Sequence, residues 1–220
     1  HGGSMRDAMN YISIPRASTI AAVLAASTCY HVALAAGTWQ QITALCPSTS
    51  GGGLMLLSDG TVLCKCEAGG TDGIGNSWNR LTPNSVGSYV DGSWSAIAAM
   101  HDTRLYFASQ LLMDGRMYVA GGEYGTGKQT AEVYNPLTNT WTSTPALGVN
   151  ISDANSEILA DGRVLQALVT GSLRSNVIYN PLTNTFANAA ACVGIHNESA
   201  WVKLRDGSIL MVDRNSTASE

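Results

Sequence analysis

The stretch Tyr134-Asn-Pro-Leu-Thr-Asn-Thr-Trp141 returns almost unchanged as Tyr179-Asn-Pro-Leu-Thr-Asn-Thr-Phe186. In both copies a strand-like run leads into a turn made of Asn, Pro, Leu and Thr, and an aromatic residue follows the turn. Asn and Pro favour tight turns, because Asn tolerates left-handed backbone and Pro presets φ. Each copy therefore predicts two antiparallel strands joined by a turn, with the aromatic side chain on the second strand.

The same pattern extends beyond these two copies and divides the chain into units. Each unit ends in an aromatic residue, and the next unit begins a strand twelve residues later and reaches an Asp-Gly pair eight residues after that. The aromatic residues are Trp39, Trp94, Trp141 and Phe186, and the Asp-Gly pairs begin at Asp59, Asp114, Asp161 and Asp206. The periods are 55, 47 and 45 residues. Such a period with one hairpin signal per unit indicates a radial array of small sheets that stack on one another.

The second unit shows what one repeat contains. Strand-like runs cover residues 106–112, 116–120 and 130–134, and a fourth surrounds Trp141. Four antiparallel strands per unit are typical of a β-propeller blade. We therefore expect an all-β propeller that is incomplete or truncated, with about three and a half four-stranded blades.

The ends of the chain suggest the following organisation. Residues 1–4 resemble the remnant of an expression tag, and residues 5–35 resemble a secretory signal peptide with Arg6 and Arg16 before the short apolar run Ile20–Ala26. That run is too short and too rich in Ala to span a bilayer, so we expect no membrane span and a secreted or periplasmic protein. The propeller is expected over 36–220, with blades at 39–94 (including a leading closing strand at Trp39), 95–141 and 142–186, and a partial blade at 187–220.

Three explanations for the partial blade stay open. The chain is a fragment of a longer propeller, a small ring with a defective last blade, or half of a ring that two copies complete. Unpaired strand edges favour association, and a two-fold homodimer is the simplest closed form. Composition excludes another class of partner: net charge is −4, 13% of residues are charged and no basic cluster is present, so we expect no nucleic-acid ligand.

Removal of the signal would leave four cysteines whose pairing is open: Cys46, Cys64, Cys66 and Cys192. Cys64 and Cys66 are two residues apart on an expected strand and cannot easily pair with each other, whereas one of them can pair with Cys46.

Asp114-Gly-Arg-Met-Tyr-Val-Ala-Gly-Gly122 and Ala131-Glu-Val-Tyr-Asn-Pro-Leu-Thr-Asn-Thr-Trp141 resemble kelch repeats, and the second unit is most similar to the propeller of the galactose oxidase and glyoxal oxidase group. The resemblance implies a copper ligand at Tyr106, cross-linked to a cysteine one blade earlier, and a stacking aromatic residue at Tyr124. Gly53 stands at the cysteine position, and Cys46 lies seven residues too early. A tyrosine and two histidines would come from later blades. We therefore do not expect copper.

Equivalent positions of different blades are expected to meet at one mouth of a central channel. The residues eight before each Asp-Gly are Gly51, Tyr106, Asp153 and Glu198, and those two residues earlier are Thr49, Arg104, Ile151 and His196. Concave sites with a few polar groups are the usual ligand sites of proteins. The expected ligand-binding residues are Arg104, Tyr106, Tyr124, Asp153, His196 and Glu198.

These residues allow several functions. The first hypothesis is a secreted kelch-type propeller that binds a carbohydrate or protein ligand at the axial or loop face. The alternative is a secreted enzyme: a galactose oxidase-like copper oxidase, or a hydrolase with Asp153, Glu198 and Tyr106 as candidate catalytic residues. Asp153, His196 and Glu198 are also candidate ligands of a divalent metal. The simplest interpretation is that the carboxylates bind strand-start amides or pair with Arg104.

Overall fold

The computed structural model describes residues 39–47, 50–67, 73–169, 174–214, 217 and 219–220. The chain divides into two units, residues 1–40 and residues 41–220, and all that follows concerns the second unit. The predicted segments at 1–4 and 5–35 lie outside the described residues. Within the described part, the secondary structure consists of strands, and no helix there is long and apolar enough to cross a membrane.

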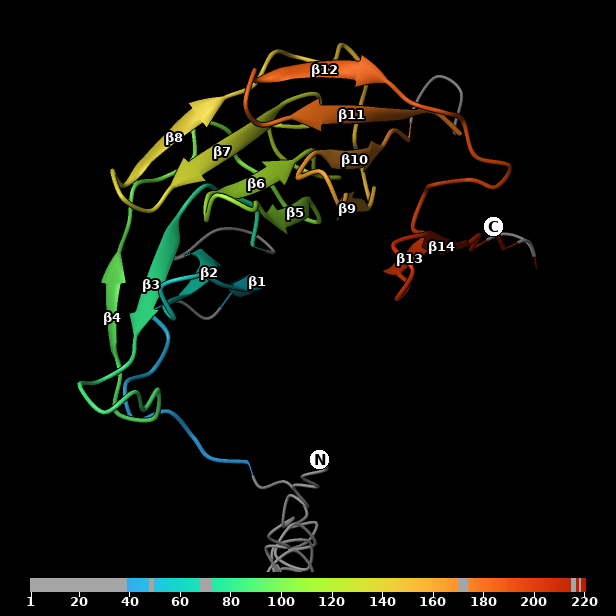
Figure 1. The fold of residues 1–220 in the computed structure, drawn as a ribbon. Helices are drawn as coiled ribbons and strands as arrows, with labels where there is room; N and C mark the ends of the chain where they lie inside the picture. Colours follow the sequence, from blue (N-terminus) through green and yellow to red (C-terminus); the bar gives the residue numbers. More distant parts are fainter. Residues whose placement is uncertain (1–38, 48–49, 68–72, 170–173, 215–216, 218) are drawn as a thin grey trace, which may run out of the picture. The chain divides into compact units, whose positions relative to one another are not determined.

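Fourteen described strands form four sheets in which neighbours in sequence are neighbours in space (Figure 1). Sheet 1 contains β1 (Ser50–Leu56), β2 (Val62–Glu67), β3 (Trp78–Thr82) and β4 (Ser93–Ala96). Sheet 2 contains β5 (Ala108–Leu111), β6 (Met117–Ala120), β7 (Ala131–Asn135) and β8 (Thr140–Ser143). Sheet 3 contains β9 (Ser156–Ile158), β10 (Val164–Ala167), β11 (Asn176–Asn180) and β12 (Thr185–Asn188), and sheet 4 contains β13 (Ala200–Lys203) and β14 (Ile209–Val212).

This architecture confirms the predicted fold class. Three sheets have four antiparallel strands each, and the fourth has two. Trp39, where a leading closing strand was predicted, belongs to the first unit and lies in no described strand.

The Asp-Gly pairs form the hairpins between the first two strands of every sheet. Each Asp accepts a hydrogen bond at Oδ1 from the backbone N–H two residues on, at 2.9 Å in Asp59, 3.1 Å in Asp114, 3.0 Å in Asp161 and 3.0 Å in Asp206. The Gly that follows has φ between 81° and 89° in all four turns, where a side chain would be strained. The Asp thus supplies the hydrogen-bond acceptor of the turn, and the Gly supplies its left-handed backbone conformation.

A row of three apolar residues crosses each complete sheet at the same register. The pairings place one residue of the row on the second strand, one on the third and one on the fourth. The rows are Val62, Leu81 and Trp94 in sheet 1, Met117, Tyr134 and Trp141 in sheet 2, and Val164, Tyr179 and Phe186 in sheet 3.

Adjacent sheets bury these rows against one another. The row of sheet 2 packs on Leu63 and Trp78 of sheet 1, and the rings of Trp78 and Trp141 lie 5.9 Å apart. At the next boundary Tyr118 of sheet 2 stacks on Tyr179 of sheet 3, with ring centroids 4.9 Å apart. The rows of sheets 2 and 3 therefore face the preceding sheet.

A buried ion pair fixes the segment that leads into sheet 2. Arg104 and Glu132 are both fully buried, and Arg104 Nη2 donates to Glu132 Oε1 at 3.1 Å. Arg104 Nη1 donates to the carbonyl oxygens of Gly121, Gly127 and Thr130 at 2.9, 2.6 and 2.8 Å. The terminal nitrogens of Arg104 are thus bonded to Glu132 of β7 and to the loop of residues 121–130, so Arg104 ties β7 to the loop that joins it to β6.

The substitution Glu132→Gln is expected to lower the free energy of unfolding by about 3 kcal/mol, because the buried guanidinium of Arg104 then keeps only the partly exposed Asp102 carboxylate, 3.4 Å away, as a paired charge. Glu157→Gln is the matched control: Glu157 pairs with Lys203 at 3.3 Å at a partly exposed site, so its loss should cost less than about 1 kcal/mol. Urea denaturation followed by tryptophan fluorescence measures both. Equal, small losses in the two variants would contradict the structural role of the Arg104–Glu132 pair.

Candidate functional site

Three equivalent residues share an unusual backbone conformation just before the first strand of their sheets. Tyr106, Asp153 and Glu198 have φ of 54°, 47° and 54° and precede β5, β9 and β13. A non-glycine residue in this region costs on the order of 1–3 kcal/mol, and such strain is often found at functional sites. The corresponding position of sheet 1 is glycine, Gly51. The repeat thus places three side chains at one type of position, ahead of the strands.

Two exposed tyrosines form the aromatic part of the site. The rings of Tyr106 and Tyr124 lie edge to face with centroids 6.3 Å apart, and their side chains are 60% and 45% exposed. The backbone holds them together, since Leu105 N donates to Tyr124 O at 3.1 Å. With Ile74 and Leu105 they line a hollow of about 510 Å³. An aromatic pair beside such a hollow can receive a small molecule with an apolar face.

Carboxylates continue the site from Tyr124 toward sheet 4. The Tyr124 hydroxyl donates to Glu123, and this hydrogen bond raises the pKa of Tyr124. Partial burial and the nearby charge of Glu123 raise the pKa of Asp153, against the opposing effect of Arg214. Glu198 N donates to Asp153 O at 3.2 Å, and the Glu198 carboxylate pairs with Arg214. We call these six residues the strand-entry cluster: Tyr106, Glu123, Tyr124, Asp153, Glu198 and Arg214.

Four of the six predicted ligand-binding residues belong to this cluster, and two lie elsewhere. Arg104 is buried in the network with Glu132 described above. His196 is also buried: its Nε2 lies 3.0 Å from Cys192 Sγ, and its ring packs on Trp201 with centroids 5.4 Å apart. Burial lowers the pKa of His196.

The geometry does not join Asp153, His196 and Glu198 into a metal centre. Within the part of the chain that the structure describes, no group of three or more His, Cys, Asp or Glu side chains is arranged to hold a metal ion. The oxidase resemblance requires a cysteine cross-linked to the copper ligand, but Gly53 of β1 stands at that position. The residues present therefore do not match the copper site that the resemblance implies.

The described side chains of Cys46, Cys64 and Cys192 lie in two separate places. Cys46 Sγ lies 3.9 Å from Cys64 Sγ, about twice the length of an S–S bond, so these two sulfurs are not bonded to each other. Cys192 lies beside His196, and burial together with the charge of Glu220 raises its pKa to about 11.

Sequence reasoning missed two members of the cluster. Glu123 directly follows the double glycine Gly121-Gly122, and both glycines have positive φ. A carboxylate directly after a glycine turn could have indicated Glu123 as a site residue from the sequence. Arg214 follows β14 and has no counterpart in the repeat that would have indicated it.

Known proteins share parts of this chain. Residues 104–148 match the family model for the kelch motif. An F-box/kelch-repeat protein of Arabidopsis thaliana is 29% identical over 154 residues, which cover 61% of this chain and 31% of that protein. Galactose oxidase of Gibberella zeae is 38% identical over 74 residues, which cover 33% of this chain and 11% of the enzyme. The structure of YjhT superposes on this chain with a TM-score of 0.54 and 16% sequence identity. The superposition covers 82% of this chain and 65% of YjhT.

The chain therefore contains a kelch motif, is similar over part of its length to kelch proteins that include galactose oxidase, and folds like part of a kelch propeller. It spans about a third of the Arabidopsis relative and about a tenth of the oxidase.

Replacement of Asp153 by Asn is expected to raise the melting temperature slightly at neutral pH, by roughly 1–2 °C. A raised folded-state pKa means that the native protein favours the protonated carboxyl, so this contribution to stability is present at low pH and is lost as pH rises through the folded pKa. The difference between variant and wild type should therefore shrink below the ordinary aspartate pKa of 3.8. Melting curves over a pH series measure it, and a difference independent of pH would contradict the assignment.

Proposed function

We propose that this kelch-repeat chain binds carbohydrate at the strand-entry cluster. The observation that supports the proposal is the pair of exposed tyrosine rings, Tyr106 and Tyr124, at a hollow whose next neighbours are carboxylates. Aromatic rings pack on the C–H faces of sugar rings, and carboxylate oxygens accept hydrogen bonds from sugar hydroxyls. Both kinds of contact are available within one continuous group of residues.

The charge of the cluster favours neutral or amino sugars. Glu123, Asp153 and Glu198 carry three acidic groups, against which stand Arg214 of the cluster and the Lys128 ammonium group, which lies over the Tyr124 ring at 6.0 Å from its centroid. Acidic sugars would bring a further negative charge to an already negative group and would be repelled. The hydrogen bond from Tyr124 to Glu123 also positions one carboxylate beside the aromatic pair.

The proposal includes export of the protein, and this part depends on the signal-like pattern of residues 5–35 alone. A protein ligand at the same face is the other partner that the repeat fold would accommodate, because kelch repeats specify a fold and not a single function.

Titration calorimetry with a panel of neutral, amino and acidic oligosaccharides tests the site. We expect binding to a neutral or amino sugar, weakened about tenfold by Tyr106→Ala and by Tyr124→Ala because each removes a stacking ring. Leu137→Ala is the control, since Leu137 is 93% exposed on the turn after β7, outside the cluster. No binding to any member of the panel, or equal loss in the control, would refute the carbohydrate proposal.

A second candidate function is hydrolysis, and the environments of Asp153 and Glu198 are the specific observation in its favour. The pKa of Asp153 is raised, whereas Glu198 is paired with Arg214, and such a division suits one acid and one base. In that case Asp153→Asn should reduce the rate of hydrolysis of chromogenic glycosides or esters by a factor of 100 or more, on the scale of general acid–base catalysis of roughly 10²–10⁴. Wild-type protein without activity on these substrates would eliminate this candidate.

A further inference from the structure

The hollow beside Tyr106 and Tyr124 is a corner between two aromatic rings. The planes of the two rings meet at 67°, and both rings line the hollow. The broad face of a sugar ring can lie against one of these aromatic faces, but the other ring is tilted too far to stack on the same sugar. A compact group in the corner contacts both rings at once. An ammonium group suits this position, because cations are attracted to the faces of aromatic rings.

Tyr124 already has an ammonium group at its face. Lys128 Nζ lies over the Tyr124 ring at 6.0 Å from the centroid, which is the outer limit of a cation–π contact. Lys128 is partly exposed and lies on the same loop as Tyr124, between β6 and β7. The ring is therefore open to a cation, and the contact with Lys128 is weak enough for a ligand to replace it.

Two carboxylates lie near the hydroxyl end of the same ring. The Tyr124 hydroxyl donates to Glu123, and this bond, together with the charges of Glu123 and Asp153, raises the pKa of Tyr124. Partial burial and the charge of Glu123 raise the pKa of Asp153. Arg214, which pairs with Glu198, offsets this effect only in part. Glu123 and Asp153 thus repel each other, and a cation beside them relieves the repulsion.

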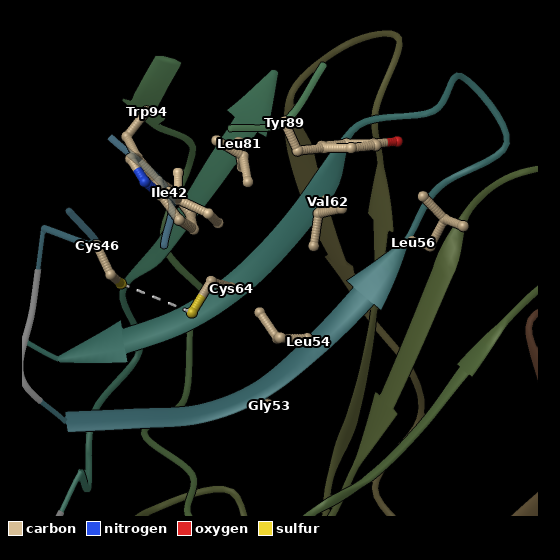
Figure 2. A pocket seen from close by; sticks show the side chains of 10 residues that line it. All are labelled: Ile42, Cys46, Gly53, Leu54, Leu56, Val62, Cys64, Leu81, Tyr89 and Trp94. Atoms are coloured by element: carbon tan, nitrogen blue, oxygen red, sulfur yellow. Dashed lines mark hydrogen bonds between the residues drawn. The ribbon is translucent and has the colours of Figure 1, made fainter. Parts of the chain in front are cut away.

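The groove over sheet 1 offers different groups to a ligand (Figure 2). It has a volume of about 730 Å³, and no charged side chain is among the described residues that line it. The Tyr89 hydroxyl in this groove donates to Gly60 O. The Trp94 indole donates to Ala44 O. Of the two hollows, the one beside Tyr124 adjoins carboxylates, so a charged group of a ligand is expected there.

We propose that the strand-entry cluster selects the protonated form of an amino sugar, whose ammonium group lies in the corner between Tyr106 and Tyr124. The ammonium group faces Glu123 and Asp153. At the Tyr124 ring it takes the place of Lys128 Nζ. This inference rests on the proposed carbohydrate function and narrows it, because it makes the positive charge of the ligand a condition of tight binding.

Titration calorimetry with two matched oligosaccharides tests the inference. One consists of glucosamine, at a pH below the pKa of its amines, and the other is its fully N-acetylated counterpart, which has the same sugar rings without the charge. We expect the glucosamine oligosaccharide to bind about five times more tightly, on the scale of a cation–π contact at an exposed site. Its affinity should fall as pH rises through the pKa of its amines. A trimethylated form stays charged and should keep its affinity over the same pH range.

Three substitutions show where the charge is recognised, and the ratio of the two affinities is the measurement. Asp153→Asn is expected to reduce the ratio to below about two, because it removes a negative charge beside the corner. Lys128→Gln is expected to raise the ratio about twofold, because it removes a competing positive charge. Asp161→Asn is the control: it changes the net charge as Asp153→Asn does, but at an exposed hairpin residue outside the cluster, and should leave the ratio unchanged.

The outcomes separate this inference from the function on which it rests. If neither oligosaccharide binds, the carbohydrate proposal fails and this inference fails with it. Equal affinities for the two leave the carbohydrate proposal standing and overturn this inference alone. A preference for glucosamine that Asp153→Asn and Lys128→Gln leave unchanged also overturns it, because the charge would then be recognised away from the corner.

Discussion

The packing of one sheet on the next is the constraint on which the rest of this structure depends. A four-stranded sheet of this size has two faces and buries neither by itself. The rows led by Met117 and Val164 become core only because the neighbouring sheet lies on them. The closing aromatic residue of each unit belongs to that row, which is why it returns at every repeat. Hairpins and turns set the register, and the register decides which residues meet.

Sequence pattern predicts this framework well. The Asp-Gly pairs and the Asn-Pro-Leu-Thr-Asn turns act within a few residues of themselves, and the structure shows their hydrogen bonds at the expected places. The equivalence of Tyr106, Asp153 and Glu198 also follows from counting along the repeat, and the shared left-handed backbone reflects that equivalence.

Side chains near those positions were less predictable. Arg104 and His196 were expected to point the same way as residues two positions later, as they would in an extended strand. The backbone turns at Tyr106 and Glu198, so the alternation of strand faces does not continue through them. Arg104 instead reaches inward to Glu132, a residue on the third strand of its own sheet, and His196 to Cys192. Contacts between distant segments of this kind leave no local pattern in the sequence.

The boundaries between sheets also encode their order. Between sheets 2 and 3 an amide meets a carbonyl oxygen, and between sheets 3 and 4 a carboxylate meets an ammonium group. If sheet 4 were shifted to pack on sheet 2, Lys203 would meet Gln110 in place of Glu157 and would lose its opposite charge. A wrong neighbour therefore leaves a charged group without its partner, at a cost that the correct neighbour avoids. Apolar row residues provide most of the burial, and these polar pairs select which sheets share it.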